Sequence, residues 1–355
     1  MQFKFTNKRI TGILGILPED VYTFEEETQR MSRVRADRLK TVMGYGQRRR
    51  AKKTTSTADL CVFGMRKLLK EGYISEKEVG AIIVVSLTPD YFVPHISNIV
   101  QGQCKLPHDI ICMDIPQGCA GYPLGLMQAF LLLEHMVDKK VVLITGDVMN
   151  RKEKEQETFI NPPSGGDAAT ITVVENDICN NEIYMELRTC GEERETLIYP
   201  CGGFRYEQGI IQQGKVEVGD GRICEPYALN MDGTAVFNFV QREVPVLLDD
   251  LFSYANKSKS DIDYYLFHQP NRFMLEKLAE KIEVSKDKMF MNIVEKYGNS
   301  NSNTIPLVIA DNLSDKICQE EYDCCLAGFG TGLALGGVLM KVGNLDFCEI
   351  VTSEL

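Results

Sequence analysis

The sequence places Cys119 where a thiol can act as a nucleophile. Cys119 lies in Gly118-Cys119-Ala120-Gly121, after a predicted strand at 110–115 and before an apolar helix at 120–137. The positive end of a helix dipole lowers a thiol pKa and favours the thiolate, while glycines permit a tight turn and close approach of a substrate. One cysteine among twelve is more often a small buried residue. The strand-to-helix setting favours the nucleophile here.

Two more polar residues stand in comparable places. His268 directly follows a predicted strand at 264–267, and functional residues gather at the carboxyl ends of parallel strands. A lone loop histidine is more often structural, but the polar Gln269-Pro270-Asn271 after it indicates a shaped loop. Asn299 lies in Tyr-Gly-Asn-Ser-Asn-Ser-Asn, which taken alone is typical of a turn and a helix cap.

Together these three residue types suit chemistry on acyl thioesters. The thiolate of Cys119 would accept an acyl group, and His268 and Asn299 would donate hydrogen bonds to the oxygen of a second thioester, stabilising an enolate. Backbone amides of Cys119 and of Thr331, in the turn Gly330-Thr331-Gly332, would stabilise the oxyanion formed during acylation.

The predicted elements that position these residues occur twice in the same order. Each half contains a helix, a strand, the candidate residue, a second helix, a second strand, a glycine turn and a last strand. In the first half these are 58–71, 81–86, Cys119, 120–137, 140–145, 165–169 and 170–174. In the second half they are 236–255, 264–267, Asn299, 303–313, 324–327, 328–332 and 335–342. The repeat thus equates Asn299 with Cys119.

Strands that alternate with helices predict a mostly parallel sheet with helices on its faces, here duplicated. We expect residues 1–175 to form a half that carries the cysteine, and residues 231–355 to form a half that carries the histidine and the asparagine. The polar, glycine-containing stretch 176–230 has weak periodicity, which predicts a connecting or inserted region.

Composition excludes several classes of protein. A formal net charge of −11 argues against nucleic acid as a partner. The chain shows neither a signal peptide nor an apolar run of membrane-spanning length. The scattered cysteines, without a CxxC pair, predict a reducing cytoplasm and no metal site. A local basic cluster contains Arg48 and Arg49; it is either a solvated surface or a docking patch for an anionic carrier.

The sequence resembles the β-ketoacyl-acyl-carrier-protein synthase III family of the thiolase superfamily over nearly its whole length. The landmarks of the resemblance are Thr88-Pro89-Asp90, Asp114-Ile115-Pro116-Gln117-Gly118-Cys119-Ala120-Gly121, Gly166-Asp167-Ala168-Ala169, Met231-Asp232-Gly233, Phe267-His268-Gln269-Pro270-Asn271, Tyr297-Gly298-Asn299-Ser300 and Gly328-Phe329-Gly330-Thr331-Gly332. The resemblance implies a duplicated five-layer αβαβα fold, usually a homodimer. It also implies a ping-pong reaction in which Cys119 is acylated and then condensed with decarboxylated malonyl carrier protein.

The chain also departs from that family. Members carry a tryptophan and an arginine that hold coenzyme A, whereas this chain has no tryptophan and has Arg38 and Val42 at the matching positions. This favours a carrier-bound or unusual acyl donor, with no resident cofactor. Carrier docking in the family uses a basic residue shortly after the histidine; Arg272 is the nearest candidate, with Phe273 at the matching position. The segment 344–355 extends beyond the usual end.

Three other functions compete with decarboxylative condensation. An acyltransferase to an oxygen or nitrogen acceptor in a specialised pathway would favour a carboxylate base at position 299, so the retained Asn299 favours condensation. A silent partner subunit would not need the Cys–His–Asn set. A hydroxymethylglutaryl-type synthase needs a glutamate base upstream of the cysteine, where this chain offers Asp90.

Overall fold

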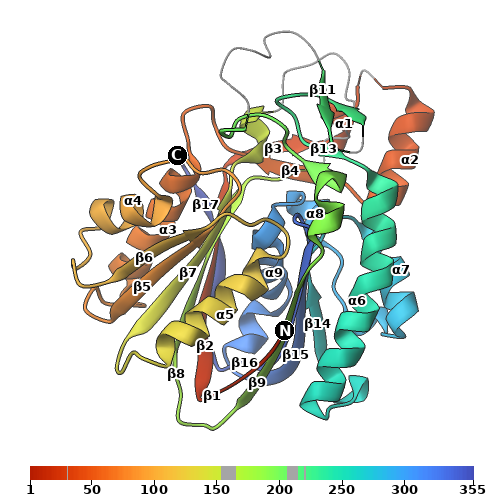
Figure 1. Cartoon of the computed structure of the whole chain (residues 1–355). Coiled ribbons are helices and arrows are strands. Elements are labelled where there is room, and N and C mark those ends of the chain that lie inside the picture. Colours follow the sequence, from red (N-terminus) through yellow and green to blue (C-terminus); the bar gives the residue numbers. More distant parts are fainter. Residues whose placement is uncertain (30, 153–164, 206–214, 220) are drawn as a thin grey trace.

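The chain folds into two large β-sheets separated by a layer of helices, with another helix layer outside each sheet (Figure 1). The computed structural model describes residues 1–355 except residue 30, residues 153–164, residues 206–214 and residue 220. Three apolar clusters fill the spaces between the five layers. The αβαβα order that the family resemblance implies is therefore confirmed.

The first sheet has six strands and carries the Cys119 turn at one edge. In spatial order they are β17 (Phe347–Ser353), β2 (Lys8–Pro18), β8 (Ala168–Asn176), β7 (Lys140–Asp147), β5 (Val79–Val85) and β6 (Ile111–Ile115). β5 is parallel to both β6 and β7, whereas β8 is antiparallel to β7 and to β2. Every residue of β5 is buried, as expected for a strand that is covered on both faces.

The second sheet repeats this arrangement with five strands. In spatial order they are β1 (Gln2–Thr6), β9 (Glu182–Thr189), β16 (Ala334–Gly343), β15 (Glu321–Gly330) and β14 (Tyr264–Phe267). β14 is parallel to β15, and β16 is antiparallel to β15 and to β9. The series β14-β15-β16-β9 thus matches β5-β7-β8-β2 in order and direction, which confirms the duplication.

Paired helices make up the three helical layers. α3 (Thr57–Glu71) and α4 (Ile96–Gln103) cover the first sheet, while α6 (Gly233–Ala255) and α7 (Arg272–Ile282) form the layer outside the second. α5 (Gly121–Leu133) and α9 (Thr304–Ile317) lie between the sheets. α5 has no charged residue, as expected for a helix that packs between two sheets. α3 starts at a Ser56–Asp59 capping box and ends at the left-handed Gly72.

Shorter elements lie around the two sheets. They are α1 (Phe24–Glu27), α2 (Arg33–Met43), α8 (Ile293–Tyr297), β3 (Asp20–Thr23), β4 (Gln47–Arg50), β10 (Leu197–Ile198), β11 (Val216–Val218), β12 (Arg222–Cys224), β13 (Asn230–Met231) and the 3₁₀ turns η1 (Met149–Lys152), η2 (Gly191–Thr196), η3 (Lys259–Asp261), η4 (Lys286–Lys288) and η5 (Asn301–Asn303).

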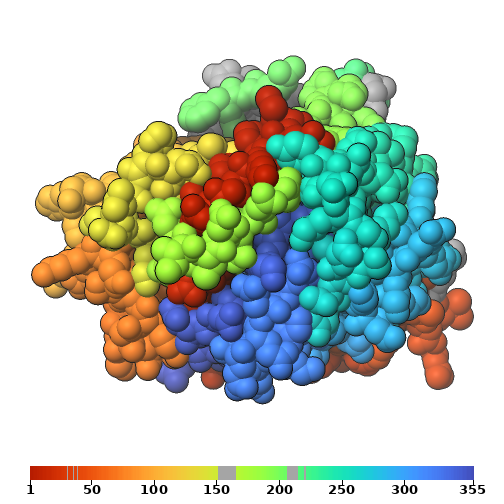
Figure 2. Space-filling view, turned by 90° about the horizontal axis from the view of Figure 1, so that it is seen from below, coloured from red at the N-terminus to blue at the C-terminus, as the bar shows by residue number. Residues whose placement is uncertain are grey.

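Several strands lie in stretches for which the sequence predicts no element, and β1 and β2 are among them. β9 falls within 176–230 yet is an inner strand of the second sheet, and β17 falls within the extension 344–355 yet forms an edge of the first. Figure 2 shows the N-terminal segment in red beside the lime-green segment that contains β9, between the orange–yellow and blue-green parts of the chain. β1 belongs to the first half of the sequence but joins the second sheet, and β17 belongs to the second half but joins the first sheet. The predicted division of the chain into halves at residues 175 and 230 therefore stays a prediction.

No helix in the described part of the chain has both the length and the apolar character that a membrane crossing requires. All twelve cysteines carry free thiols.

Candidate active site

Cys119 lies between β6 and α5 in a closely packed turn. Its side chain is buried, with 7% of the residue exposed. The backbone of Gly330, at φ +154°, passes so close that a Cβ at this position would lie 2.8 Å from the Cys119 sulfur. A Cβ on Gly328 would lie 2.7 Å from the carbonyl oxygen of Cys119. The glycines at the end of β15 therefore allow the second half of the chain to approach the thiol.

The acidity of Cys119 differs from the sequence-based expectation. Burial raises the pKa of this thiol to about 11, even though the backbone N–H groups of Thr331 and Cys119 lower it. We expected the start of the following helix to lower the pKa, but α5 begins at Gly121, with Ala120 as its N-cap. In this environment desolvation outweighs the helix dipole, so the resting residue is a thiol.

His268 follows the end of β14 and is also buried. Its Nδ1 lies 2.8 Å from Thr304 Oγ1. That hydroxyl donates its hydrogen to the carbonyl oxygen of Asn301 at 2.9 Å, so it accepts from Nδ1–H, and Nε2 keeps a lone pair. Burial lowers the pKa of His268 to about 3. Nε2 has no hydrogen-bond partner within the described residues, and it is the nitrogen free to meet a substrate.

The segment 299–304 contacts both predicted catalytic residues. Cys119 Sγ donates to Asn301 Oδ1 at 3.7 Å, and Ser302 Oγ donates to the carbonyl oxygen of Gly118. Asn299 Oδ1 instead accepts from the backbone N–H of Asn301 at 3.0 Å. Asn299 O accepts from Gly166 N at 2.9 Å. Asn299 is thus adjacent to the site, while the amide that touches the thiol belongs to Asn301.

A buried carboxylate, Asp147 at the end of β7, completes this group. Its Oδ2 accepts from Asn301 Nδ2 at 3.0 Å, and its Oδ1 accepts from Leu87 N and Thr88 Oγ1. Burial raises the pKa of Asp147 to about 7, although these hydrogen bonds lower it. A carboxyl group that titrates near neutrality is therefore two hydrogen bonds from the thiol.

The sequence analysis singled out neither Asn301, Asp147 nor Thr304. The sequence does contain a signal for Asp147. This residue ends the apolar strand β7, and the carboxyl end of β7 lies on the same side of the sheet as the carboxyl end of β6, which leads to Cys119. Nothing local distinguishes Asn301 from Asn299 in an asparagine-rich turn. Its left-handed backbone, with φ +55°, is visible only in the structure.

Thr331 lies on the other side of the thiol. Its backbone N–H lowers the pKa of the Cys119 thiol, and its Oγ1 lies 3.5 Å from Gln117 Oε1. The amide of Thr331 is therefore close to the nucleophile, where the oxyanion role predicted for it requires a donor.

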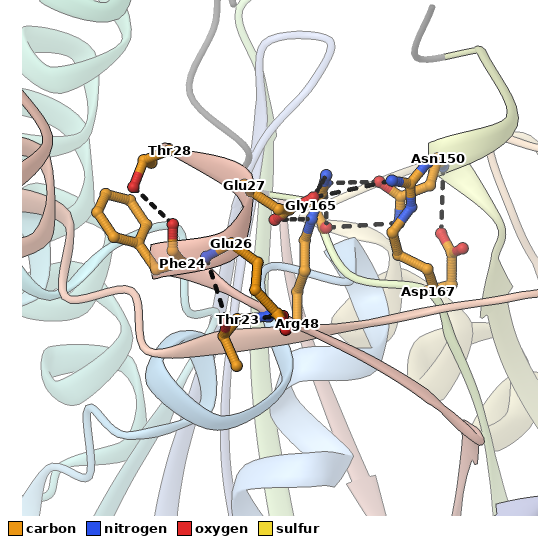
Figure 3. Close-up of polar contacts among 10 residues, drawn as sticks. Thr23, Phe24, Glu26, Glu27, Thr28, Arg48, Asn150, Gly165 and Asp167 are labelled. Carbon is orange, nitrogen blue, oxygen red and sulfur yellow. Dashed lines mark hydrogen bonds and ion pairs between the residues drawn. The ribbon is translucent and has the colours of Figure 1, made fainter. Parts of the chain in front are cut away.

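The two arginines predicted for docking are held by the protein itself. Arg48 is 1% exposed; its guanidinium forms an ion pair with Glu27 and donates to Asn150 Oδ1 at 2.6 Å (Figure 3). Arg49 Nη1 donates to the carbonyl oxygens of Pro18 and Glu19, each at 3.1 Å. The docking prediction is corrected for Arg48, because its side chain is not exposed to a carrier.

Arg272, the third docking candidate, is the first residue of α7 and remains partly exposed. Its guanidinium forms an ion pair with Glu295, and its stem packs against Gly44 at the end of α2. Val42 is exposed on α2, while the side chain of Arg38 lies outside the described residues.

Comparisons with known proteins agree with this architecture. A family model for the C-terminal part of 3-oxoacyl-[acyl-carrier-protein] synthase III matches residues 252–342. The chain is 26% identical over 342 residues to the β-ketoacyl-[acyl-carrier-protein] synthase III of Lactobacillus helveticus, covering 95% of this chain and 99% of that protein.

Solved structures match over nearly the full length. The 3-oxoacyl-(acyl-carrier protein) synthase from Burkholderia xenovorans superposes with a TM-score of 0.90 at 28% identity, covering 99% of each chain. A 3-oxoacyl-(acyl-carrier-protein) synthase III structure gives 0.85 at 28% identity, covering 94% of this chain and 99% of that one. The chain is therefore a 3-oxoacyl-[acyl-carrier-protein] synthase III-like protein, similar to these acyl-transferring enzymes in sequence and fold over nearly its whole length.

Proposed function

We propose that this enzyme acylates Cys119 from an acyl thioester and then condenses the acyl group with malonyl carrier protein. The observation that supports this most is the convergence of the thiol, the free Nε2 of His268 and the asparagine-rich segment 299–304 at one place. The names of the relatives point to the same reaction class.

In the acylation step, Nε2 of His268 is suited to accept the Cys119 proton because its lone pair is free. The sulfur attacks the acyl carbonyl, and the backbone amides of Cys119 and Thr331 stabilise the oxyanion. The C–S bond of the donor then breaks, and the proton passes from His268 to the departing thiolate. The donor leaves as a thiol, and Cys119 becomes a thioester.

In the condensation step, malonyl carrier protein loses carbon dioxide, and the electrons of the broken C–C bond form an enolate. Asn299 Nδ2 and a protonated Nε2 of His268 would stabilise the enolate oxygen. Donation from Nε2 requires the Thr304 hydroxyl to turn and donate to Nδ1. The enolate carbon attacks the acyl group, the bond to Cys119 breaks, and the released thiolate takes up one proton.

Acyl carrier protein is the macromolecular partner in this proposal, and its phosphate-bearing arm requires cationic contacts. Arg272 is a partly exposed candidate among the three predicted arginines, and carrier binding would have to compete with its Glu295 ion pair. The altered positions Arg38 and Val42 favour a carrier-bound donor over coenzyme A, in a pathway that serves fatty-acid or specialised acyl synthesis.

We also propose that the enzyme is a homodimer joined at β6. This strand is the edge of the first sheet, and an open edge with apolar side chains favours pairing with another strand. Ile111 on β6 is 41% exposed. Tyr91 and Phe92 are also exposed, and Asp114 on β6 tethers the same loop by accepting from Ile96 N at 2.8 Å.

Intact-mass measurement tests the proposed reaction. Wild type and Cys119→Ala are exposed to acyl-coenzyme A and acyl-carrier thioesters, after which malonyl carrier protein is added and carbon dioxide release is measured. We expect a mass increase of one acyl group in wild type only, followed by carbon dioxide release and a 3-oxoacyl product. Acylation without carbon dioxide release, with an ester or amide product, would instead establish transfer to an oxygen or nitrogen acceptor.

A further inference from the structure

The Cys119 thiol has a hydrogen-bond partner that forms no part of the predicted Cys–His–Asn set. Asn301 Oδ1 accepts from Sγ at 3.7 Å, and Asn301 Nδ2 donates to Asp147 Oδ2 at 3.0 Å. The three side chains come from the turn after β6, the end of β7 and the segment between α8 and α9. A single carboxamide therefore bridges the nucleophile and a buried carboxyl group.

The hydrogen bonds of Asp147 explain the orientation of the amide. Its Oδ1 accepts from Leu87 N at 2.8 Å, from Thr88 Oγ1 at 3.1 Å and from Ser86 Oγ at 3.3 Å. Its Oδ2 accepts only from Asn301 Nδ2 within the described residues. An ionised carboxylate only accepts hydrogen bonds, so it holds the NH₂ end of the amide. The carbonyl end then faces the sulfur, where it stabilises the thiol and cannot stabilise a thiolate.

We propose that Asn301 sets the acidity of Cys119 and that the charge on Asp147 decides which end of the Asn301 amide faces the sulfur, an inference that rests on Cys119 being the proposed nucleophile. When Oδ2 of Asp147 carries a proton, this O–H donates to Asn301 Oδ1. The amide then turns over, and Nδ2 donates to the thiolate. The state with a thiol and a carboxylate contains the same number of protons as the state with a thiolate and a carboxylic acid, so the exchange is balanced.

Of the titratable groups Asp147, Cys61 and His268, only Asp147 has a pKa near neutrality. Burial raises the pKa of Asp147 to about 7. Cys61 of α3 lies within range of the charges of Asp147, Asp90 and Asp114, and burial raises the pKa of its thiol well above its usual range. Burial lowers the pKa of His268 to about 3. Both Cys61 and His268 therefore stay neutral between pH 6 and pH 8, where the proposed change occurs.

Asp147→Asn tests the inference because it mimics the protonated carboxyl group and holds the Asn301 amide in the turned orientation. The donors from Ser86, Leu87 and Thr88 retain the new Oδ1, so the new Nδ2 occupies the position of Oδ2 and donates to Asn301 Oδ1. The Asn301 NH₂ then faces Cys119. We expect the pKa of Cys119 to fall by about one unit, which gives about a tenfold faster alkylation by iodoacetamide below pH 9. Alkylation of Cys119 is followed by peptide mass spectrometry between pH 6 and pH 10.

A double-mutant cycle separates the turned amide from simple loss of a nearby charge. Asn301→Gly removes the amide but tolerates the left-handed backbone at φ +55°. The acceleration by Asp147→Asn should shrink at least threefold in the Asn301→Gly background. Asp167→Asn, at a second buried carboxyl group that hydrogen-bonds Ala51 N and Asn150 N, should leave the Cys119 alkylation rate unchanged.

Two results overturn the inference: an equal acceleration with and without the Asn301 side chain, or no acceleration by Asp147→Asn in protein that melts cooperatively. Alkylation needs no acyl donor, so this test is independent of the proposed reaction. Wild type that no donor acylates would refute the proposed function, while the alkylation profiles would still decide the role of Asn301.

Discussion

At the scale of single residues, the site depends on the absence of one side chain as much as on those present. Gly330 lies against Cys119 with a backbone that L side chains rarely adopt. We expect Gly330→Ala to slow alkylation and acylation of Cys119 at least tenfold, because its methyl group would lie 2.8 Å from the sulfur. Strain should also lower the free energy of unfolding by about 1–3 kcal/mol. Rates and urea unfolding measure the two effects.

Gly221→Ala is the matched control. Gly221 also has a positive φ, +83°, but the nearest atom to its Cβ position is 3.7 Å away, in Glu217. This variant should lose stability without any change at Cys119. Alkylation of Gly330→Ala at the wild-type rate would contradict the close approach.

The shifted pKa values of His268 and Asp147 predict how the free energy of unfolding changes with pH. Burial lowers the pKa of His268 to about 3, from 6.5. Between these values the unfolded state binds one more proton, so stability falls by about 1.4 kcal/mol per pH unit as pH decreases. Asp147 acts in the opposite direction: its raised pKa, about 7 instead of 3.8, adds stability as pH falls through that range. The two effects partly cancel in wild type.

His268→Asn isolates the histidine, since an asparagine can keep the hydrogen bond to Thr304. We expect this variant to gain stability relative to wild type as pH falls from 6.5 to 5, measured by urea unfolding at pH 7.5 and pH 5. A difference that stays constant with pH would show that the folded protein protonates His268 at its ordinary pKa.

Local sequence patterns located some residues of the site and missed others. Cys119 follows the edge strand β6 and His268 follows the largely buried strand β14. Functional residues gather at the carboxyl ends of such strands, so local sequence predicts their location. Asn301 and Asp147 act through contacts that span 182 and 154 residues of sequence, which no local pattern encodes. Arg48 lies in a basic cluster that resembles an exposed surface, yet Glu27 and Asn150 neutralise and bury it.

At the scale of elements, the segment 299–304 organises the whole site. Asn301 contacts the thiol, Ser302 holds the carbonyl oxygen of Gly118, and Thr304 holds His268. Asn303 Oδ1 accepts from Thr145 on β7 at 2.7 Å. The repeat gave Asn299 of this segment the position in the second half that Cys119 has in the first. The contacts of the individual side chains required the structure, because every partner lies in another element.

Thr304→Val tests this organisation. The variant leaves the donors His268 Nδ1 and Gln269 N without their shared hydroxyl acceptor, which costs about 1–3 kcal/mol in the free energy of unfolding. The rate of condensation should fall more than the rate of Cys119 alkylation, because only condensation requires a correctly held imidazole. Thr304→Ser keeps the hydroxyl and should retain both rates; equal impairment of the two variants would show that the methyl group, not the hydroxyl, matters.

At the scale of the whole molecule, we expect the edge strand β6 of the first sheet to determine assembly. β6 leads within four residues to Cys119, so a second copy paired along this strand would also brace the nucleophile turn. Barriers to edge pairing include charged side chains, lysine above all, and the exposed Ile111 offers none. We expect wild type to be a dimer at micromolar concentration in light scattering, and Ile111→Lys to increase the monomer fraction and slow acylation of Cys119.

Val137→Lys provides the comparison, because Val137 is even more exposed than Ile111 but lies between α5 and β7 and not on β6. This variant adds the same charge and should remain dimeric with wild-type acylation. A monomeric wild type would refute assembly at β6, and a dimer that Ile111→Lys leaves intact would move the interface elsewhere. If the monomer is acylated at the full rate, the edge serves assembly alone, because the turn that carries Cys119 is then already held by the contacts from residues 299–304.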